Sequence, residues 1–193
     1  MKSKILLALR YLSYYLSSKN KHAFHSPFVF DLVTKVFNKE ERLEIFKPIE
    51  QRRKKLSNDK TIINIRDFGA GFGGTIYKER TVSYITKNSS KPEKYARLLY
   101  RLTNYFKPNV MLELGTSVGI SAVYQAMGNP QGKLITIEGC ENTSALAQQT
   151  FTTLNANNIL LINEEFESAL EKIFVEHSTI DYEIGRASCR ERV

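Results

Sequence analysis

The chain downstream of residue 90 alternates between short apolar runs and longer amphipathic segments. The apolar runs predict strands at 109–115, 133–139 and 158–163, and the segments around them predict helices at 92–106, 119–128, 143–156 and 166–176. Residues 178–182, "STIDY", begin a fourth strand. Regular alternation of strand and helix requires right-handed crossovers and a parallel sheet. The pattern therefore predicts an α/β, Rossmann-like domain whose first three to four strands lie within 91–182.

The upstream pattern is different and predicts a mainly helical N-terminal extension over 1–90. Ser26 followed by Pro27 is typical of a helix start, since serine caps and proline suits the first helical position. Residues 39–58 have a helical pattern with one proline break. Residues 61–90 are short, Gly-rich pieces that periodicity does not assign.

Charge divides the chain in nearly the same place. Residues 1–107 carry 23 Lys and Arg against 9 Asp and Glu, whereas residues 108–182 carry 2 against 9. A basic arm on an acidic domain can mark an anionic partner, nucleic acid included, or the two parts can neutralise each other by packing. Hydrophobic residues make up 42% of the chain, which is typical of a folded protein rather than a disordered one.

Composition also bears on where the protein works. The two cysteines suggest no disulfide framework, which fits a reducing compartment. The N-terminal apolar run is too short for a signal peptide, and no run approaches the ~18 apolar residues of a membrane span. We therefore expect a cytoplasmic protein without a transmembrane segment.

Two glycine-rich loops compete for the role of a nucleotide-binding turn: "DFGAGFGG" at 67–74 and "ELGTSVGIS" at 113–121. Such a loop must turn tightly from strand to helix, and the next strand must end in an acid about 20 residues on. The second loop meets both demands, because Gly115 follows a strand, Gly119 precedes a helix, and Glu138 lies 19 residues after Gly119. No second strand ending in an acid follows the first loop, which we interpret as part of the extension.

The residues of the second loop also indicate the kind of cofactor. A dinucleotide fold favours G-x-G-x-x-G, because a pyrophosphate lies against bare backbone, but Ser117 occupies the middle position here. Glu113 stands just before the loop, where a carboxylate repels a pyrophosphate and attracts a cation. S-adenosylmethionine (SAM) carries such a cationic ammonium group.

The run "VMLELGTSVGIS…LITIEGC" resembles motifs I and II of class I SAM-dependent methyltransferases, particularly small O-methyltransferase-like members. The resemblance covers about residues 108–182, and residues 20–107 resemble the N-terminal extension of uncharacterised bacterial members. It implies a Rossmann-like SAM-binding domain that transfers a methyl group to an unknown acceptor, an oxygen of a small molecule being the expectation.

The resemblance also implies a set of cofactor-binding residues: Glu113, Gly115, Thr116, Ser117, Gly119, Glu138, Gly139, Cys140 and Glu165. Glu113 would orient the methionine amino group through water, and Glu138 would bind the ribose hydroxyls. Gly139 and Cys140 would line the adenine, and Glu165 would stand at the adenine amine. The family usually has glycine where this chain has Glu164. Strand-end solvation of the two acids, and helix capping by Thr116 and Ser117, are the alternative explanations.

Several functional features stay unassigned. No catalytic residue and no metal ligand can be named, although some members hold Mg²⁺ with carboxylates from later strands. Two alternatives remain open: a dinucleotide-dependent Rossmann enzyme, and a non-catalytic module whose basic arm binds nucleic acid or an anionic surface. Salt dependence of binding would favour the latter.

Residues 183–193, "EIGRASCRERV", break the pattern of the domain. Three Arg and two Glu in eleven residues do not suit a strand at the centre of a parallel sheet. The segment resembles the translation of a common sequencing adapter. We therefore expect it to be artefactual, and the 193-residue chain to be unstable and inactive in methyl transfer even if it binds SAM weakly. Reading the genomic locus past codon 182 tests this expectation.

Overall fold

The computed structural model describes residues 10, 11, 13, 26–39, 42–67 and 76–185. The chain divides into two compact units, Met1–Glu40 and Glu41–Val193. In the first unit, helix α2 (Pro27–Leu32) continues into a π-helical turn, η2 (Val33–Phe37). The Ser26 side chain accepts a hydrogen bond from the Val29 backbone N–H, and Pro27 is the first helical residue. The predicted helix start is therefore confirmed.

The second unit holds a four-stranded, fully parallel sheet in the order β5-β4-β3-β6. The strands are β3 (Val110–Leu114), β4 (Lys133–Ile137), β5 (Ile159–Ile162) and β6 (Tyr182–Gly185). The helices that alternate with them are α5 (Glu93–Phe106), α6 (Ile120–Gly128), α7 (Glu141–Thr153) and α8 (Phe166–Glu176). The predicted α/β, Rossmann-like architecture is confirmed.

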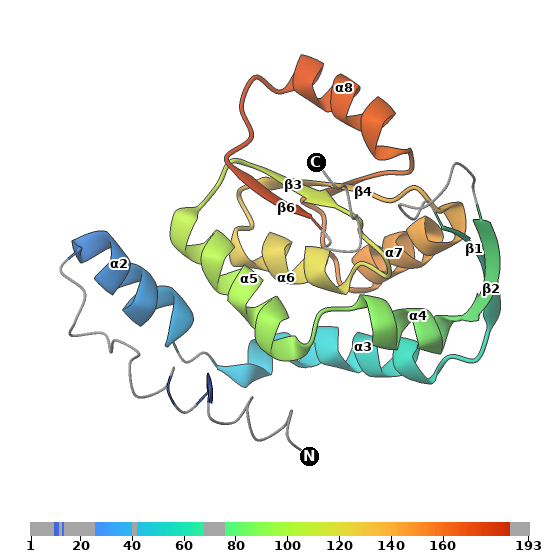
Figure 1. The fold of residues 1–193 in the computed structure, drawn as a ribbon, viewed down its shortest axis with the longest axis horizontal. Helices are drawn as coiled ribbons and strands as arrows, with labels where there is room; N and C mark the ends of the chain where they lie inside the picture. Colours follow the sequence, from blue (N-terminus) through green and yellow to red (C-terminus); the bar gives the residue numbers. More distant parts are fainter. Residues whose placement is uncertain (1–9, 12, 14–25, 40–41, 68–75, 186–193) are drawn as a thin grey trace. The chain divides into compact units, whose positions relative to one another are not determined.

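Helices cover both faces of this sheet, as Figure 1 shows. Alternate residues of a strand point to opposite faces. Met111 and Leu134 accordingly join a buried cluster with residues of α6 and α7, while Leu112 and Ile135 pack with Ala169 of α8 on the other face. Both strands are buried on two sides, which explains why their sequences are apolar runs.

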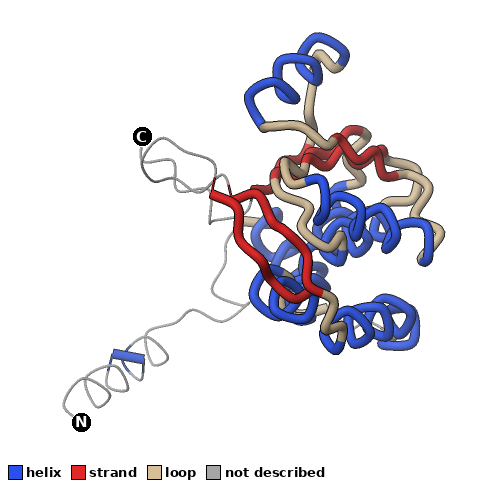
Figure 2. The backbone as a smooth tube through the Cα atoms, turned by 90° about the vertical axis from the view of Figure 1, so that its right-hand side faces the viewer, coloured by secondary structure: helices blue, strands red, loops and turns tan. Residues whose placement is uncertain are grey.

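The part of the second unit that precedes the four-stranded sheet is only partly helical. It contains η3 (Leu43–Phe46), α3 (Lys47–Asn58), an antiparallel hairpin of β1 (Ile62–Asp67) and β2 (Ile76–Thr81), and α4 (Val82–Ser89). Periodicity had left this hairpin unassigned. Figure 2 shows it as a two-stranded ribbon separate from the larger sheet. Phe46, Ile49 and Val82 of this segment belong to the same buried cluster as Met111.

Strand β6 runs further than the sequence pattern predicted. Residues Glu183, Ile184 and Gly185 pair with β3, although we expected the strand to fail after Tyr182. In the described sheet β6 is an edge strand, and Glu183 is exposed while Ile184 is half-buried. An edge strand tolerates a polar residue on its solvent side, so the glutamate does not end it. Residues 186–193 lie outside the described part of the chain.

Candidate functional site

The loop after β3 is shaped by three residues with left-handed backbone conformations: Gly115 (φ 91°), Ser117 (φ 52°) and Gly119 (φ 81°). The backbone N–H groups of Gly115 and Thr116 both donate to the Ile137 carbonyl at the end of β4, at 3.0 and 3.2 Å. The loop therefore turns sharply over the carboxyl ends of two neighbouring strands. This is the edge of a parallel sheet where ligands of such folds bind.

Glu113 lies at the base of this loop, buried to 4% exposure. One carboxylate oxygen accepts hydrogen bonds from Ser121 Oγ and Gln125 Nε2, and the other accepts from Thr136 Oγ1, all at 2.8 Å. Because Thr136 gives its proton to Glu113, the 2.6 Å contact between the two threonine hydroxyls makes Thr116 the donor to Thr136. Burial raises the pKa of Glu113 above its usual 4.5, and these hydrogen bonds oppose the rise.

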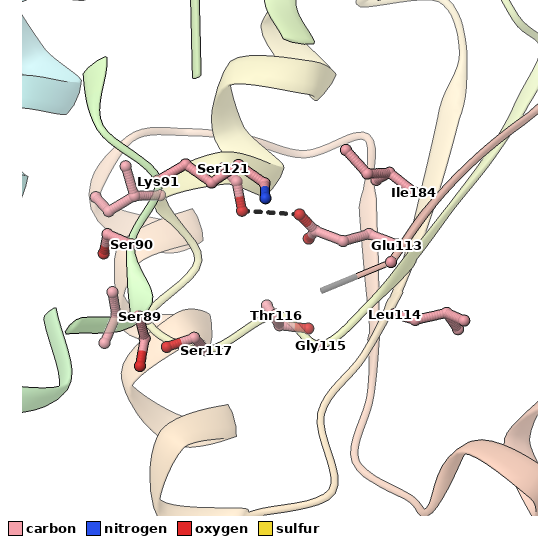
Figure 3. Close-up of a pocket in the computed structure, with 13 residues that line it drawn as sticks. Ser89, Ser90, Lys91, Glu113, Leu114, Gly115, Thr116, Ser117, Ser121 and Ile184 are labelled. Atoms are coloured by element: carbon pink, nitrogen blue, oxygen red, sulfur yellow. Dashed lines mark hydrogen bonds between the residues drawn. The ribbon is translucent and has the colours of Figure 1, made fainter. Parts of the chain in front are cut away.

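A first, narrow hollow lies beside Glu113, with about 20 Å³ of space for the centre of a water-sized molecule. Figure 3 shows Gly115, Thr116 and Ser117 on one side of it and Ser89–Lys91, at the end of α4 and just after it, on another. The hydroxyls of Ser90 and Ser117 are buried and have no hydrogen-bond partner among the described residues. Orphaned buried hydroxyls are costly, so their presence beside a hollow indicates a place where a polar ligand can satisfy them.

Glu138, the first residue after β4, joins two loops. Its carboxylate accepts the Ser117 backbone N–H at 2.7 Å and the Cys140 backbone N–H at 3.1 Å, one on each oxygen. The Asn163 side chain donates to the Glu138 carbonyl at 2.6 Å, which adds the loop after β5. Each carboxylate oxygen keeps acceptor capacity, since an ionised carboxylate has about four lone-pair sites.

A second, larger hollow, with about 300 Å³ of space for water-sized molecules, lies beside Gly139 and Cys140. Its lining comes from three places in the sequence, namely the loop after β4, the loop after β5 and the β1–β2 hairpin: Gly139, Cys140, Glu141, Asn142, Asn163, Glu164, Glu165, Asn64, Arg66 and Tyr77. Arg66 forms an ion pair with Glu165, with Nη2 and Oε1 2.9 Å apart. The Arg66 backbone N–H also donates to Cys140 Sγ at 3.3 Å.

The structure distributes the sequence-predicted residues over these two hollows. Glu113, Gly115, Thr116 and Ser117 line the first, and Gly139, Cys140 and Glu165 line the second. Glu138 lines neither hollow, but its carboxylate accepts hydrogen bonds from a lining residue of each, Ser117 and Cys140. Gly119 lines neither hollow; it packs against Phe151 at the start of α6. Of the "DFGAGFGG" loop only Asp67 is described, as the last residue of β1.

Sequence reasoning missed Ser89–Lys91 and the hairpin residues Asn64, Arg66 and Tyr77. A Ser-Ser-Lys run before the Pro92 helix start is a weak signal that could have drawn attention to the first group. Nothing in the sequence signals the second group. Within the described residues, no three His, Cys, Asp or Glu side chains gather as a metal-binding cluster, and no helix is long and apolar enough to cross a membrane.

No protein-family model and no curated protein matches the sequence. Solved structures do resemble the fold. An O-methyltransferase from Bacillus cereus in complex with S-adenosylhomocysteine (SAH) aligns with a TM-score of 0.56 and 16% identity, over 83% of this chain and 60% of that one. An O-methyltransferase of tomaymycin synthesis from Streptomyces achromogenes, in complex with SAM, aligns with a TM-score of 0.46 and 16% identity, over 81% of this chain and 56% of that one. A SAH-bound methyltransferase from Podospora anserina aligns with a TM-score of 0.49 and 14% identity, over 81% of this chain and 56% of that one.

The likeness to the Bacillus cereus structure shows that this chain shares the fold of that O-methyltransferase. The identity is low, so the likeness concerns the fold alone. The chain spans about three fifths of the length of that structure.

Proposed function

We propose that this chain binds S-adenosylmethionine and provides the cofactor-binding part of a methyltransferase that acts on an oxygen of a small molecule. The observation that carries the proposal is the pair of hydrogen bonds at Glu138, whose carboxylate accepts from Ser117, which lines the first hollow, and from Cys140, which lines the second. A ligand with one polar end, a central diol and a planar base at the other end suits this arrangement. We place the protein in the cytoplasm as part of the same proposal.

The residues fit the amino-acid end of the cofactor. Glu113 supplies a buried carboxylate beside the first hollow, and a cationic amino group can meet it directly or through water. Lys91 supplies a positive charge, and Ser90 and Ser117 supply unsatisfied hydroxyls for the carboxylate group. The two charges of a zwitterion therefore each find a partner of opposite sign in one hollow.

The residues also fit the nucleoside end. Glu138 can accept hydrogen bonds from two ribose hydroxyls while keeping its bonds to Ser117 and Cys140, because each oxygen has a further lone pair. Gly139 and Cys140 lead from there into the second hollow, which is wide enough to take a base. When bound, the cofactor would supply a methyl group activated by a sulfonium centre.

The chain's own contribution to the reaction is orientation. Positioning of reactants lowers the barrier of a bimolecular transfer, and the described residues provide fixed polar contacts for it. No described residue is assigned to receive the proton of the acceptor. A dinucleotide is a poorer fit, because a pyrophosphate would have to approach the carboxylate of Glu113.

Isothermal titration calorimetry of the full 193-residue chain with SAH and with NAD tests the proposal. We expect binding of SAH and none of NAD. Glu138→Ala should weaken SAH binding by about 1.5–3 kcal/mol, the scale of a hydrogen bond to a charged group. Glu171→Ala, which removes an equal charge from an exposed position on α8, should leave the affinity unchanged. Absence of SAH binding by the wild-type chain, or equal affinity of Glu138→Ala, would overturn the proposal.

A further inference from the structure

The β1–β2 hairpin lies outside the Rossmann-like sheet, yet it forms one wall of the second hollow. Asn64 and Arg66 of β1 and Tyr77 of β2 all line it, opposite the loops that follow β4 and β5. The two sides of the hollow thus come from parts of the chain that are remote in sequence. A wall of this kind is not part of the sheet-and-loop architecture that gives the fold its cofactor site.

Hydrogen bonds and an ion pair attach the hairpin to the loops and to the first turn of α7. The Asn142 side chain donates to the Asn64 carbonyl at 2.7 Å, and the Arg66 backbone N–H donates to Cys140 Sγ at 3.3 Å. The Arg66 guanidinium pairs with Glu165 at 2.9 Å. The two hydrogen bonds hold the hairpin backbone against Cys140, in the loop after β4, and Asn142, in the first turn of α7, and the ion pair fixes a hairpin side chain against the start of α8.

The ion pair changes the role of Glu165. The resemblance assigned this carboxylate to the amine of an adenine, but here it faces an arginine from another part of the chain. The Arg66 side chain is 38% exposed and that of Glu165 57% exposed, so solvent reaches the pair and its own contribution to stability is small. Its geometric effect is to hold the arginine beside the hollow.

Tyr77 completes the wall. It is the direct cross-strand partner of Arg66, so both side chains point to the same face of the ribbon. Tyr77 is 71% exposed although it borders a hollow. An aromatic ring and a guanidinium side by side offer two planar surfaces, and both kinds of surface stack on nucleobases.

We propose that the hairpin supplies the base-binding wall of the cofactor site, with Tyr77 as the stacking surface and Glu165 as a positioning residue that acts through Arg66 rather than by contacting the base amine. This inference rests on the proposed function. It assigns three residues to affinity for the nucleoside end, two of which lie upstream of the sheet.

Calorimetric titration of the full chain with SAH, and with S-inosylhomocysteine in which the base amine is replaced by a carbonyl, tests this assignment. We expect Tyr77→Ala to weaken SAH binding at least fivefold and Tyr77→Phe to stay within twofold, since the phenylalanine ring still stacks. Arg66→Ala and Glu165→Gln should each weaken it about two- to fivefold. The double variant should be no weaker than Arg66→Ala, because Glu165 acts only through the arginine.

The base analogue separates the two possible roles of Glu165. If Glu165 acts through Arg66, the ratio of SAH to S-inosylhomocysteine affinity is the same in Glu165→Gln as in Arg66→Ala. Loss of this ratio in Glu165→Gln alone would show that the carboxylate reads the base amine and would overturn its positioning role.

The matched control is Arg80→Ala, which removes an equal charge from the same hairpin. Arg80 is three residues from Tyr77 on β2 and so lies on the opposite face, where its guanidinium stands 5.3 Å from the Tyr84 ring centroid. The Arg80→Ala variant should therefore bind SAH with the same affinity as the wild type. Thermal unfolding without ligand identifies any variant that fails to fold.

The outcomes distinguish this inference from the proposed function. Wild-type binding of SAH together with unchanged affinity in Tyr77→Ala and Arg66→Ala would overturn the hairpin wall alone. Failure of the wild-type chain to bind SAH would overturn the proposed function and this inference with it.

Discussion

Replacement of Gly119 by alanine tests how tightly the sequence of the loop after β3 is constrained. Gly119 has φ 81° and is the residue from which α6 begins. An added Cβ would stand 2.7 Å from Cε1 of Phe151 and 3.2 Å from the Ala147 backbone. Phe151 is 3% exposed and belongs to the main buried cluster, so its ring has little room to retreat.

Two terms set the expected magnitude. A non-glycine residue in the left-handed region costs about 1–2 kcal/mol. Moving a packed aromatic ring to admit a methyl group costs about 1–3 kcal/mol more, the usual range for overpacking a core. The unfolding free energy should therefore fall by roughly 2–5 kcal/mol, a large part of the ~5–15 kcal/mol that typical domains have.

Urea unfolding followed by circular dichroism measures this change. Gly185→Ala is the control, because its nearest neighbour would be Leu114 Cβ at 4.0 Å and its φ is not positive; it should stay within about 0.5 kcal/mol of the wild type. In a Phe151→Leu background the steric part of the Gly119→Ala cost should shrink and the backbone part should remain. A Gly119→Ala chain that unfolds within 0.5 kcal/mol of the wild type would refute the reasoning.

Three further predictions concern the surroundings of the site. Burial raises the pKa of Glu113 in the folded chain above its value in the unfolded chain, so the unfolding free energy of the wild type should fall relative to that of Glu113→Gln as the pH rises from 4.5. Urea unfolding of both proteins over a series of pH values measures this difference, and a rise in relative stability would contradict the prediction. Gly128→Ala would place Cβ 2.1 Å from Thr103 Oγ1 where α5 meets α6, so the midpoint of thermal unfolding should drop by several degrees, and an unchanged midpoint would show that α5 can move aside. The two N–H groups of the Asn158 side chain are shared among three carbonyls, that of Ala126 in α6 and those of Asn129 and Gly132 in the loop after it. Asn158→Ala should therefore cost about 1–3 kcal/mol in urea unfolding, while Asn157→Ala, which lacks those bonds, should not.

The parts of the fold that the sequence predicted are those where burial dictates residue type. β3 and β4 are covered on both faces, so Met111, Leu112, Leu134 and Ile135 form short apolar runs. The hairpin was missed for the opposite reason. It is a two-stranded ribbon whose second strand has four consecutive polar residues, Lys78–Thr81, so β2 shows neither an apolar run nor an alternation that would mark it as a strand.

The residues of the candidate site likewise fall into a predictable group and an unpredictable one. Glu113 and Glu138 were predictable, because an acid at the end of a buried strand is conspicuous and the parallel topology brings strand ends together. The pairing of Arg66 with Glu165 was not, since these residues are 99 positions apart and only the packing of the hairpin on the loops joins them. Sequence patterns indicate whether a strand or helix is buried, but they do not indicate which distant segment of the chain packs against it.

Glu138 shows why one residue can decide both the shape of the site and its chemistry. The strand order places the ends of β3 and β4 side by side, so a carboxylate after β4 can reach the backbone N–H groups of both following loops. Those bonds use one lone pair on each oxygen and leave the others able to accept further hydrogen bonds. Loop geometry and acceptor geometry are therefore fixed by the same side chain. A substitution at Glu138 must change both together, whereas Tyr77 or Lys91 can change affinity while the loops keep their places.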